Sequence, residues 1–325
     1  MQTRTLSLAL LSLTLGAATA ALAQPAAPVQ PQTPLTWAYG VNTPGVNLPA
    51  ATGPQHVPDS KLELVFPRDR FSPPDWHPED HPAMPPVVAS GHAPQVMACA
   101  YCHLPNGQGR PENASLAGLS ADYIKQQLAD YRASLRKSAE PQMSPPSLMQ
   151  AIGLNTTAEE AEQAASYFAG LQPRRWIRVV ETASVPETVV SGWMYIPKPG
   201  TAVKEPIANR ILEMPENLER TELRDSRSSF VAYVPVGSIA RGKQLANGNG
   251  GLASACSACH GADLRGLGPV PRLAGRSPSY LARQLYDLQT SNRKGLWSPL
   301  MTAVVAKLTP EDMLALAAYI ASLEP

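Results

Sequence analysis

The four cysteines of this 325-residue chain all lie within two copies of one five-residue pattern. The first copy is CAYCH, from Cys99 to His103, and the second is CSACH, from Cys256 to His260. The second copy follows the first by 157 positions. Because no cysteine remains outside the two copies, whatever chemistry the thiols perform must be performed twice. The fold must therefore present both pentapeptides in the same way.

The sequence around each pentapeptide repeats as well. Residues 116–128 (LAGLSADYIKQQL) match residues 273–285 (LAGRSPSYLARQL) at the same displacement of 157. Residues 164–173 (AASYFAGLQP) match residues 316–325 (LAAYIASLEP) at a displacement of 152, so the first copy holds five extra residues between the matched blocks. Matched blocks in the same order indicate two copies of one domain. We predict these domains at 91–173 and 238–325.

Both copies have the pattern of helical domains. Residues 123–131 carry Tyr, Gln and Tyr at a spacing of four, which places these side chains on one face of an amphipathic helix. The closing helix of each copy has a start signal, Thr157 with Glu160 in the first copy and Thr309 with Asp312 in the second. A hydroxyl followed three residues later by a carboxylate is typical of a capping box.

The remaining segments have other compositions. Residues 24–90 contain fifteen prolines, which are too frequent for helices or central strands, and we expect an extended arm. Residues 174–237 include WIRVVE, VVSGWMYI and SSFVAYVP, which are rich in β-branched and aromatic residues. We predict that this connector forms short strands or hairpins that hold the two domains together.

The first 23 residues are typical of a cleavable signal peptide. Arg4 supplies positive charge, an apolar run follows, and Ala21 and Ala23 form an A-x-A cleavage site before Gln24. We therefore expect export of the mature chain. No later stretch is long and apolar enough to span a bilayer, and the net charge of +1 gives no support for nucleic-acid binding.

The C-x-x-C pattern has three common interpretations: a redox dithiol, half of a zinc site, or attachment of haem. A redox dithiol is typical of a thioredoxin-like βαβ unit, and a zinc site needs four ligands in a tetrahedron. The histidine directly after the second cysteine favours haem. Cysteines at i and i+3 lie on one side of a helical turn, where each can add to a porphyrin vinyl group, and the next residue projects toward the iron. We predict two haem c groups, one attached through Cys99 and Cys102 with His103 as the proximal ligand, the other through Cys256 and Cys259 with His260.

A second axial ligand determines what each haem can do, and methionine is the candidate in both copies. Met301 comes just before the final helix of the second copy. Met149 is displaced from Met301 by 152, the same displacement that aligns the final helices, so we choose it for the first haem. Met143 remains an alternative because it lies near the insertion. A methionine before a helix usually fills a core, but the matched position in two haem-bearing copies favours ligation.

Other residues in the repeats are candidates for supporting roles. The free ring N–H of each proximal histidine needs an acceptor, and Pro271 offers a carbonyl in the second copy. Its counterpart in the first copy is Ala114, with Pro111 nearby. Basic residues at matched positions could meet haem propionates or form a solvated loop; they are Arg136, Lys137, Arg293 and Lys294.

With these motifs the sequence resembles bacterial class I cytochromes c, and especially the tandem two-haem cytochromes of the c-four type. The resemblance rests on C-x-x-C-H, the LAG…Y…QL block, the methionine and the closing AAY-x-A-S-L helix, and it covers 91–173 and 238–325. It implies a mainly α fold of two class I cytochrome c domains, here joined by a long connector with short β-strands. It also implies a periplasmic protein that passes electrons from a dehydrogenase or quinol-oxidising complex to a terminal oxidase or other acceptor.

We therefore predict an electron-transfer protein with two His/Met-ligated haems, and not an enzyme. One alternative is the cytochrome subunit of a periplasmic dehydrogenase, in which the arm and the connector would form a docking surface. A second alternative is a dihaem peroxidase, which needs one haem able to open a coordination position. The matched methionines weigh against a peroxidase.

Overall fold

A computed structural model describes residues 34–48, 53–65, 69–249 and 254–325. All of these residues belong to one compact unit. The predicted signal peptide at 1–23 lies outside the described residues. Within the described ranges, no helix has both the length and the apolar character needed to cross a bilayer.

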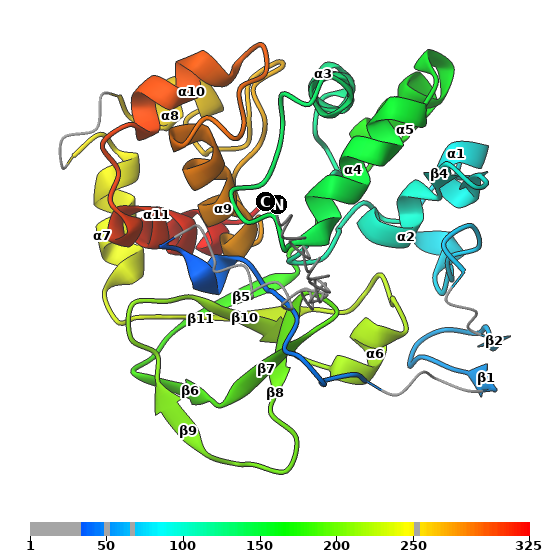
Figure 1. The fold of residues 1–325 in the computed structure, drawn as a ribbon, viewed down its shortest axis with the longest axis horizontal. Coiled ribbons are helices and arrows are strands. Elements are labelled where there is room, and N and C mark those ends of the chain that lie inside the picture. The colour runs from blue at the N-terminus through cyan, green and yellow to red at the C-terminus, as the bar shows by residue number, and fades with distance from the viewer. Residues whose placement is uncertain (1–33, 49–52, 66–68, 250–253) are drawn as a thin grey trace, which may run out of the picture. The chain divides into compact units, whose positions relative to one another are not determined.

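The first repeat copy is helical, as predicted (Figure 1). A short hairpin of β3 (Gly91–His92) and β4 (Val96–Met97) precedes the haem motif. The helices are α1 (Pro86–Ala89), α2 (Cys99–His103), α3 (Ala121–Arg132), α4 (Ser144–Asn155) and α5 (Ala158–Gly170).

The second copy repeats this order without the hairpin. Its helices are α7 (Ser238–Ala246), α8 (Ser257–His260), α9 (Pro278–Gln289), α10 (Ser298–Val305) and α11 (Pro310–Ser322). The capping boxes predicted from sequence are present in both copies, at the starts of α5 and α11.

Backbone hydrogen bonds confirm that the two copies are one structure built twice. The Gly118 amide donates to the Phe168 carbonyl at 3.0 Å, and the Gly275 amide donates to the Ile320 carbonyl at 3.0 Å. The first bond joins the loop before α3 to α5, and the second joins the loop before α9 to α11. The two glycines are 157 positions apart and the two acceptors are 152 positions apart, which are the displacements that align the sequences. The fold class predicted from sequence is confirmed.

The copies differ in the helix that precedes the haem motif. In the second copy, nine-residue α7 packs against α11, and the two helices approach most closely at Gly242. A Cβ built on Gly242 would lie 1.9 Å from the Ala315 carbonyl oxygen, so only glycine permits this crossing. In the first copy the corresponding helix is α1, which has four residues and contacts α5. Helix α1 therefore covers less of α5 than α7 covers of α11.

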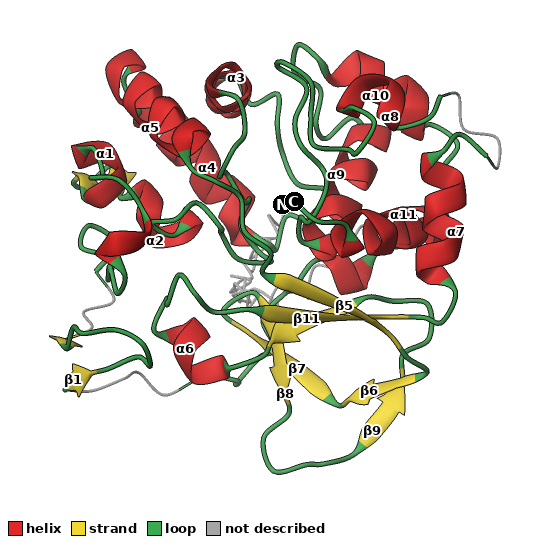
Figure 2. Ribbon diagram, turned by 180° about the vertical axis from the view of Figure 1, so that it is seen from behind, coloured by secondary structure: helices red, strands yellow, loops and turns green. Residues whose placement is uncertain are grey.

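The connector contains the strands expected from its composition, which Figure 2 shows gathered in one region. A three-stranded sheet has the order β10-β11-β5, with β11 antiparallel to β10 and parallel to β5. Two further pairs, β6 with β9 and β7 with β8, are antiparallel. The one helix of this segment, α6, was not predicted. The elements are β5 (Ile177–Glu181), β6 (Ser184–Pro186), β7 (Thr188–Ser191), β8 (Met194–Pro197), β9 (Lys204–Pro206), β10 (Leu212–Pro215), α6 (Leu218–Glu222) and β11 (Phe230–Val234).

The connector contacts both copies through hydrogen bonds, as predicted. The side-chain amide of Asn106 in the first copy donates to the Ser226 carbonyl at 2.6 Å. In the second copy, Glu213 of β10 is 2 % exposed and accepts from Ser277 Oγ at 2.7 Å and from the Ser279 amide at 3.1 Å. A buried carboxylate from the connector thus satisfies donors at the start of α9.

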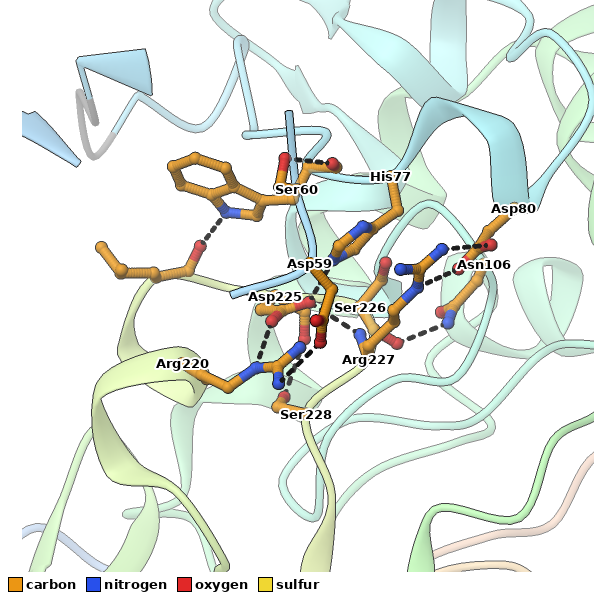
Figure 3. A network of polar contacts seen from close by, with 12 residues as sticks. Asp59, Ser60, His77, Asp80, Asn106, Arg220, Asp225, Ser226, Arg227 and Ser228 are labelled. Atoms are coloured by element: carbon orange, nitrogen blue, oxygen red, sulfur yellow. Dashed lines mark hydrogen bonds and ion pairs between the residues drawn. The ribbon is translucent and has the colours of Figure 1, made fainter. Parts of the chain in front are cut away.

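In its described residues the proline-rich arm is mostly coil, as predicted, and the short elements there are η1 (Thr36–Ala38), β1 (Pro54–Gln55), β2 (Leu64–Val65) and η2 (Pro78–Asp80). It is held to the connector by a buried polar network (Figure 3). His77 is fully buried, and its Nε2 lies 2.9 Å from Asp225 Oδ1. Asp225, also fully buried, accepts from Arg220 Nε at 2.5 Å as well.

A second ion pair lies beside this network. Arg227 Nε donates to Asp80 at 2.7 Å, and this hydrogen bond holds the pKa of Asp80 well below its usual range. The indole N–H of Trp76 donates to the Leu223 carbonyl at 2.7 Å. These contacts join segments that are almost 150 residues apart in sequence, so the arm is a fixed part of the fold at this point.

Gly242→Ala is expected to destabilise the protein, because the new methyl group would push α7 away from the backbone of α11. Overpacking of this kind costs about 1–3 kcal/mol. The measurement is the thermal midpoint of the haem-loaded protein by circular dichroism. Gly170→Ala is the control, since nothing lies within 4 Å of a Cβ there. Equal midpoints for both variants would contradict the close approach.

Asp225→Ala is expected to cost about 3 kcal/mol, because it leaves fully buried His77 and partly buried Arg220 without their shared acceptor. Chemical denaturation measures the free energy of unfolding. Asp59→Asn is the control: its carboxylate is 71 % exposed and lies 3.8 Å from Arg220 Nη1, so loss of this charge should cost less than about 1 kcal/mol, and asparagine tolerates the positive φ of this position. A loss at Asp225 as small as the loss at Asp59 would show that the network does not anchor the arm.

Candidate functional site

Each C-x-x-C-H pentapeptide lies on a single helical turn, as predicted. Cys99 begins α2, and Cys256 is the N-cap of α8, so in both copies the two cysteines are one turn apart. All four thiols are free of disulfide bonds. Burial raises the pKa of the Cys99 thiol to about 12, so this group is protonated at neutral pH.

The two histidines are oriented by the same hydrogen bond. His103 Nδ1 lies 2.8 Å from the Ala114 carbonyl oxygen, and His260 Nδ1 lies 2.8 Å from the Pro271 carbonyl oxygen. A carbonyl can only accept, so Nδ1–H donates and the Nε2 lone pair is left free for a metal. The acceptor predicted at Pro271 is confirmed, and its counterpart is Ala114. Burial lowers the pKa of both imidazoles, which favours the neutral, ligating form.

His103 and Met149 line one cavity, with a volume of about 850 Å³ including its opening. Helix α3 supplies another wall through Tyr123 and Ile124. A second cavity of about 950 Å³ shares Met149 and reaches Cys102. The alternative methionine, Met143, is 1 % exposed within the hydrophobic core and is absent from the described linings of these cavities.

The second copy has the equivalent cavity. Cys259, His260 and Met301 line a space of about 1300 Å³, mostly among apolar side chains of α9 and α10. The structure therefore brings Met301 to the cavity of His260, just as it brings Met149 to that of His103.

The residues at both sites fit a haem c group. Two free thiols one turn apart suit thioether attachment, and each neighbouring imidazole has Nε2 available. Each cavity also contains a thioether sulfur. Cavities lined mainly by apolar side chains, with a few convergent polar groups, are typical of sites for organic groups.

The two copies contact each other through a pair of matched arginines. Arg136 Nη2 donates to Tyr280 Oη and to Gln284 Oε1, both at 2.9 Å. Arg293, at the matched position, makes the mirror contacts to Tyr123 Oη and Gln127 Oε1, both at 2.9 Å. The four acceptors are related by the same displacement of 157. Neither arginine belongs to a solvated loop: Arg136 is 6 % exposed and Arg293 is partly buried.

This contact gives the two cavities a common wall. Residues from both copies line the cavity of His103 and that of His260; they are Tyr123, Gln127, Arg276, Tyr280 and Gln284. Burial by itself would raise the pKa of Tyr280, but the guanidinium groups of Arg136, Arg276 and Arg293 bring it down to about 8. The shared wall is therefore strongly positive, which suits negatively charged groups in either cavity.

Three buried arginines at this wall were missed in the sequence. Arg276 Nη2 donates to the Ser115 carbonyl at 3.0 Å, and Arg283 Nη2 donates to the Pro111 carbonyl at 2.6 Å. Arg272 Nη2 lies 3.3 Å from the Ala117 carbonyl. All three belong to the second copy and donate to the first. A difference between the two copies could have identified these arginines, because the first copy has no arginine at any of the three matched positions.

Comparisons with known proteins indicate the family of the chain. The family model described as "Cytochrome c" matches residues 239–324. The chain is 41% identical over 70 residues to cytochrome c-554(548) of Halomonas halodenitrificans, which covers 21% of this chain and 84% of the relative. It is 24% identical over 235 residues to cytochrome c4 of Azotobacter vinelandii, covering 70% of this chain and 86% of that protein. It is 41% identical over 68 residues to the thiosulfate dehydrogenase electron acceptor of Stutzerimonas stutzeri, covering 20% of this chain and 30% of the relative.

Replacing both cysteines of one motif is expected to remove one haem and leave the other. The pairs are Cys99→Ala with Cys102→Ala, and Cys256→Ala with Cys259→Ala. Intact mass of the denatured protein should fall by one covalent haem in each double variant, and the absorbance of the haemochrome should halve. A variant that still carries two covalent haems would contradict the assignment of attachment sites.

Proposed function

The chain belongs to the cytochrome c family as a dihaem electron-transfer protein similar to cytochrome c4, and we propose that it carries electrons in the periplasm through two six-coordinate haems. In this proposal His103 and Met149 ligate the first iron, and His260 and Met301 ligate the second. The protein acts as a carrier between redox proteins and not as an enzyme.

One observation carries the ligand assignment. In each copy a histidine with a free Nε2 shares a cavity with the methionine at the matched position. Met143, the competing residue, is packed in the core away from the described cavity walls. This favours Met149 over Met143 as the ligand of the first iron.

When bound, each haem supplies a one-electron Fe(III)/Fe(II) couple. The chain's residues tune that couple. The carbonyls of Ala114 and Pro271 hold each imidazole in the tautomer that presents Nε2, and this contact increases the donor strength of the ring. A thioether as the sixth ligand raises the potential and closes the iron to substrates, as a carrier requires. The common wall supports transfer of electrons between the two sites within one molecule.

A second candidate function is the cytochrome subunit of a periplasmic dehydrogenase. The observation in its favour is the similarity to a relative described as an electron acceptor of thiosulfate dehydrogenase. In this case the donor is the dehydrogenase itself, and the chain would co-purify with a larger subunit. In the carrier function, by contrast, the protein binds its partners transiently. The donor is then a dehydrogenase or quinol-oxidising complex, and the acceptor is an oxidase or another protein.

The ligands are tested by comparing Met149→Ala, Met143→Ala and Met301→Ala. We expect Met149→Ala and Met301→Ala each to remove about half of the methionine-to-iron charge-transfer band of the oxidised protein and to lower one of the two reduction potentials, because the thioether is lost. Met143→Ala should keep the whole band and lose stability, by about 2–5 kcal/mol for a buried methionine.

Loss of the band in Met143→Ala, with the band retained in Met149→Ala, would reverse the assignment for the first haem. A high-spin ferric signal in the unmodified protein, together with turnover of peroxide, would replace the carrier by an enzyme. Both measurements use the full chain with both haems attached.

A further inference from the structure

The loop that follows the C-x-x-C-H motif has opposite exposure in the two copies. In the first copy every residue from 104 to 112 is buried. In the second copy the matched residues 261–269 are mostly exposed, and Leu264 is the one buried member. The two loops have the same internal hydrogen bonds: the amides of Gly109 and Gly266 donate to His103 and His260 carbonyls at 2.9 and 2.8 Å. The difference therefore comes from what lies outside the loops.

The connector covers the loop of the first copy. Asn106 and Gln108 donate their side-chain amides to the carbonyls of Ser226 and Ser228, at 2.6 and 2.7 Å. The Arg224 guanidinium lies over the Tyr101 ring inside the first C-x-x-C-H motif, at 3.7 Å from the ring centroid. Residues of the connector therefore cover the loop that follows the first C-x-x-C-H motif, whereas the matched loop of the second copy is exposed.

The equivalent side of the second copy is apolar and open. Leu267 is 64 % exposed, Leu300 is 69 % exposed and Trp297 is 55 % exposed. Trp297, Leu300 and Pro269 line the same cavity as Cys259 and His260, so they gather where this cavity meets the surface. At positions matched to Leu267 and Pro269, the first copy has buried Arg110 and Glu112, which form an ion pair at 3.0 Å. We call residues 262–270 with Leu296, Trp297 and Leu300 the second-site face.

Charged residues at the margin of this face are mainly basic. Arg265 and Lys294 are exposed next to Leu267 and Leu296 in sequence. Asp263 is the acidic residue of the same loop, and its carboxylate lies 3.6 Å from Arg265 Nε. The margin thus keeps a net positive charge around an apolar centre, which complements a partner with an apolar contact and an acidic rim.

We propose that the second-site face is the surface at which this protein exchanges electrons with a partner redox protein, one whose contact face is apolar at its centre and acidic at its rim. The connector covers the matched loop of the first copy, so electrons reach or leave the first haem through the second. This inference rests on the proposed function. The inference extends the proposed function, because only the second haem would then exchange electrons directly with a partner protein.

The test uses an electrode that imitates such a partner: gold coated with methyl-terminated thiols that contain a minority of carboxylate-terminated chains. The double variant Leu267→Gln with Leu296→Gln is expected to lower the interfacial electron-transfer rate about tenfold, because each exposed leucine loses apolar contact at the interface. Lys294→Glu should lower the rate at low ionic strength and lose this effect at high salt. These side chains are mostly exposed, so folding should be unaffected.

The control is Leu154→Gln with Val236→Gln, two exposed apolar residues away from the second-site face, at 62 % and 73 % exposure. Its rate should equal that of the unmodified protein. Reduction by ascorbate in solution should be unchanged in all variants. A protein in which ascorbate reduces fewer than two haems would contradict the proposed function. Normal reduction, with an electrode rate that does not respond to the change at Leu267 and Leu296, would overturn the docking surface alone.

Discussion

The hydrogen bond from each histidine Nδ1 to a loop carbonyl eleven residues later is the interaction on which both sites depend. It fixes the ring in one tautomer, leaves Nε2 free, and requires the loop to return to the helix that carries the cysteines. Positive φ angles make that return possible. Leu104 and Gly261 have positive φ directly after the histidines, and Gly109 and Gly266 have positive φ at the end of the turn. The rest of each cavity is assembled around this oriented imidazole.

Duplication followed by divergence explains the unequal sites. The inner surfaces of both copies keep the matched tyrosine, glutamine and arginine, because Arg136 and Arg293 each need acceptors from the opposite copy. The outer surfaces were free to change. In the first copy a buried ion pair, Arg110 with Glu112, lies beneath the connector, whereas exposed Leu267 and Pro269 stand at the same positions in the second.

The arm and the connector are joined to each other, and both segments also contact the second copy. Buried His77 and Asp225 join them, and Trp76 donates to a connector carbonyl close by. Neither segment belongs to the repeated unit, and both lie against its first copy. Their effect is to remove from solvent a surface that the repeated unit would otherwise expose, at the expense of burying charges that need partners.

Much of this protein could be predicted from local patterns. The C-x-x-C-H spacing indicated haem, the displacements of 157 and 152 indicated two copies, and the capping residues located the closing helices, because each of these signals is set by neighbours within a turn or two of helix. The choice of Met149 used the same displacement, and the cavity of His103 contains that residue. Helix α6, the arginines Arg272, Arg276 and Arg283, and the closure of the first site were not predictable in this way.

The sequence by itself therefore determined the type of domain, its duplication and the residues suited to hold haem. Only the tertiary structure decided which side of each copy remains open. The physical reason is that exposure depends on contacts between segments more than 100 residues apart, such as Gln108 with Ser228 and Asn106 with Ser226. An asparagine or glutamine in a polar loop has the same local signal whether it meets water or a distant carbonyl, and only the folded chain distinguishes the two.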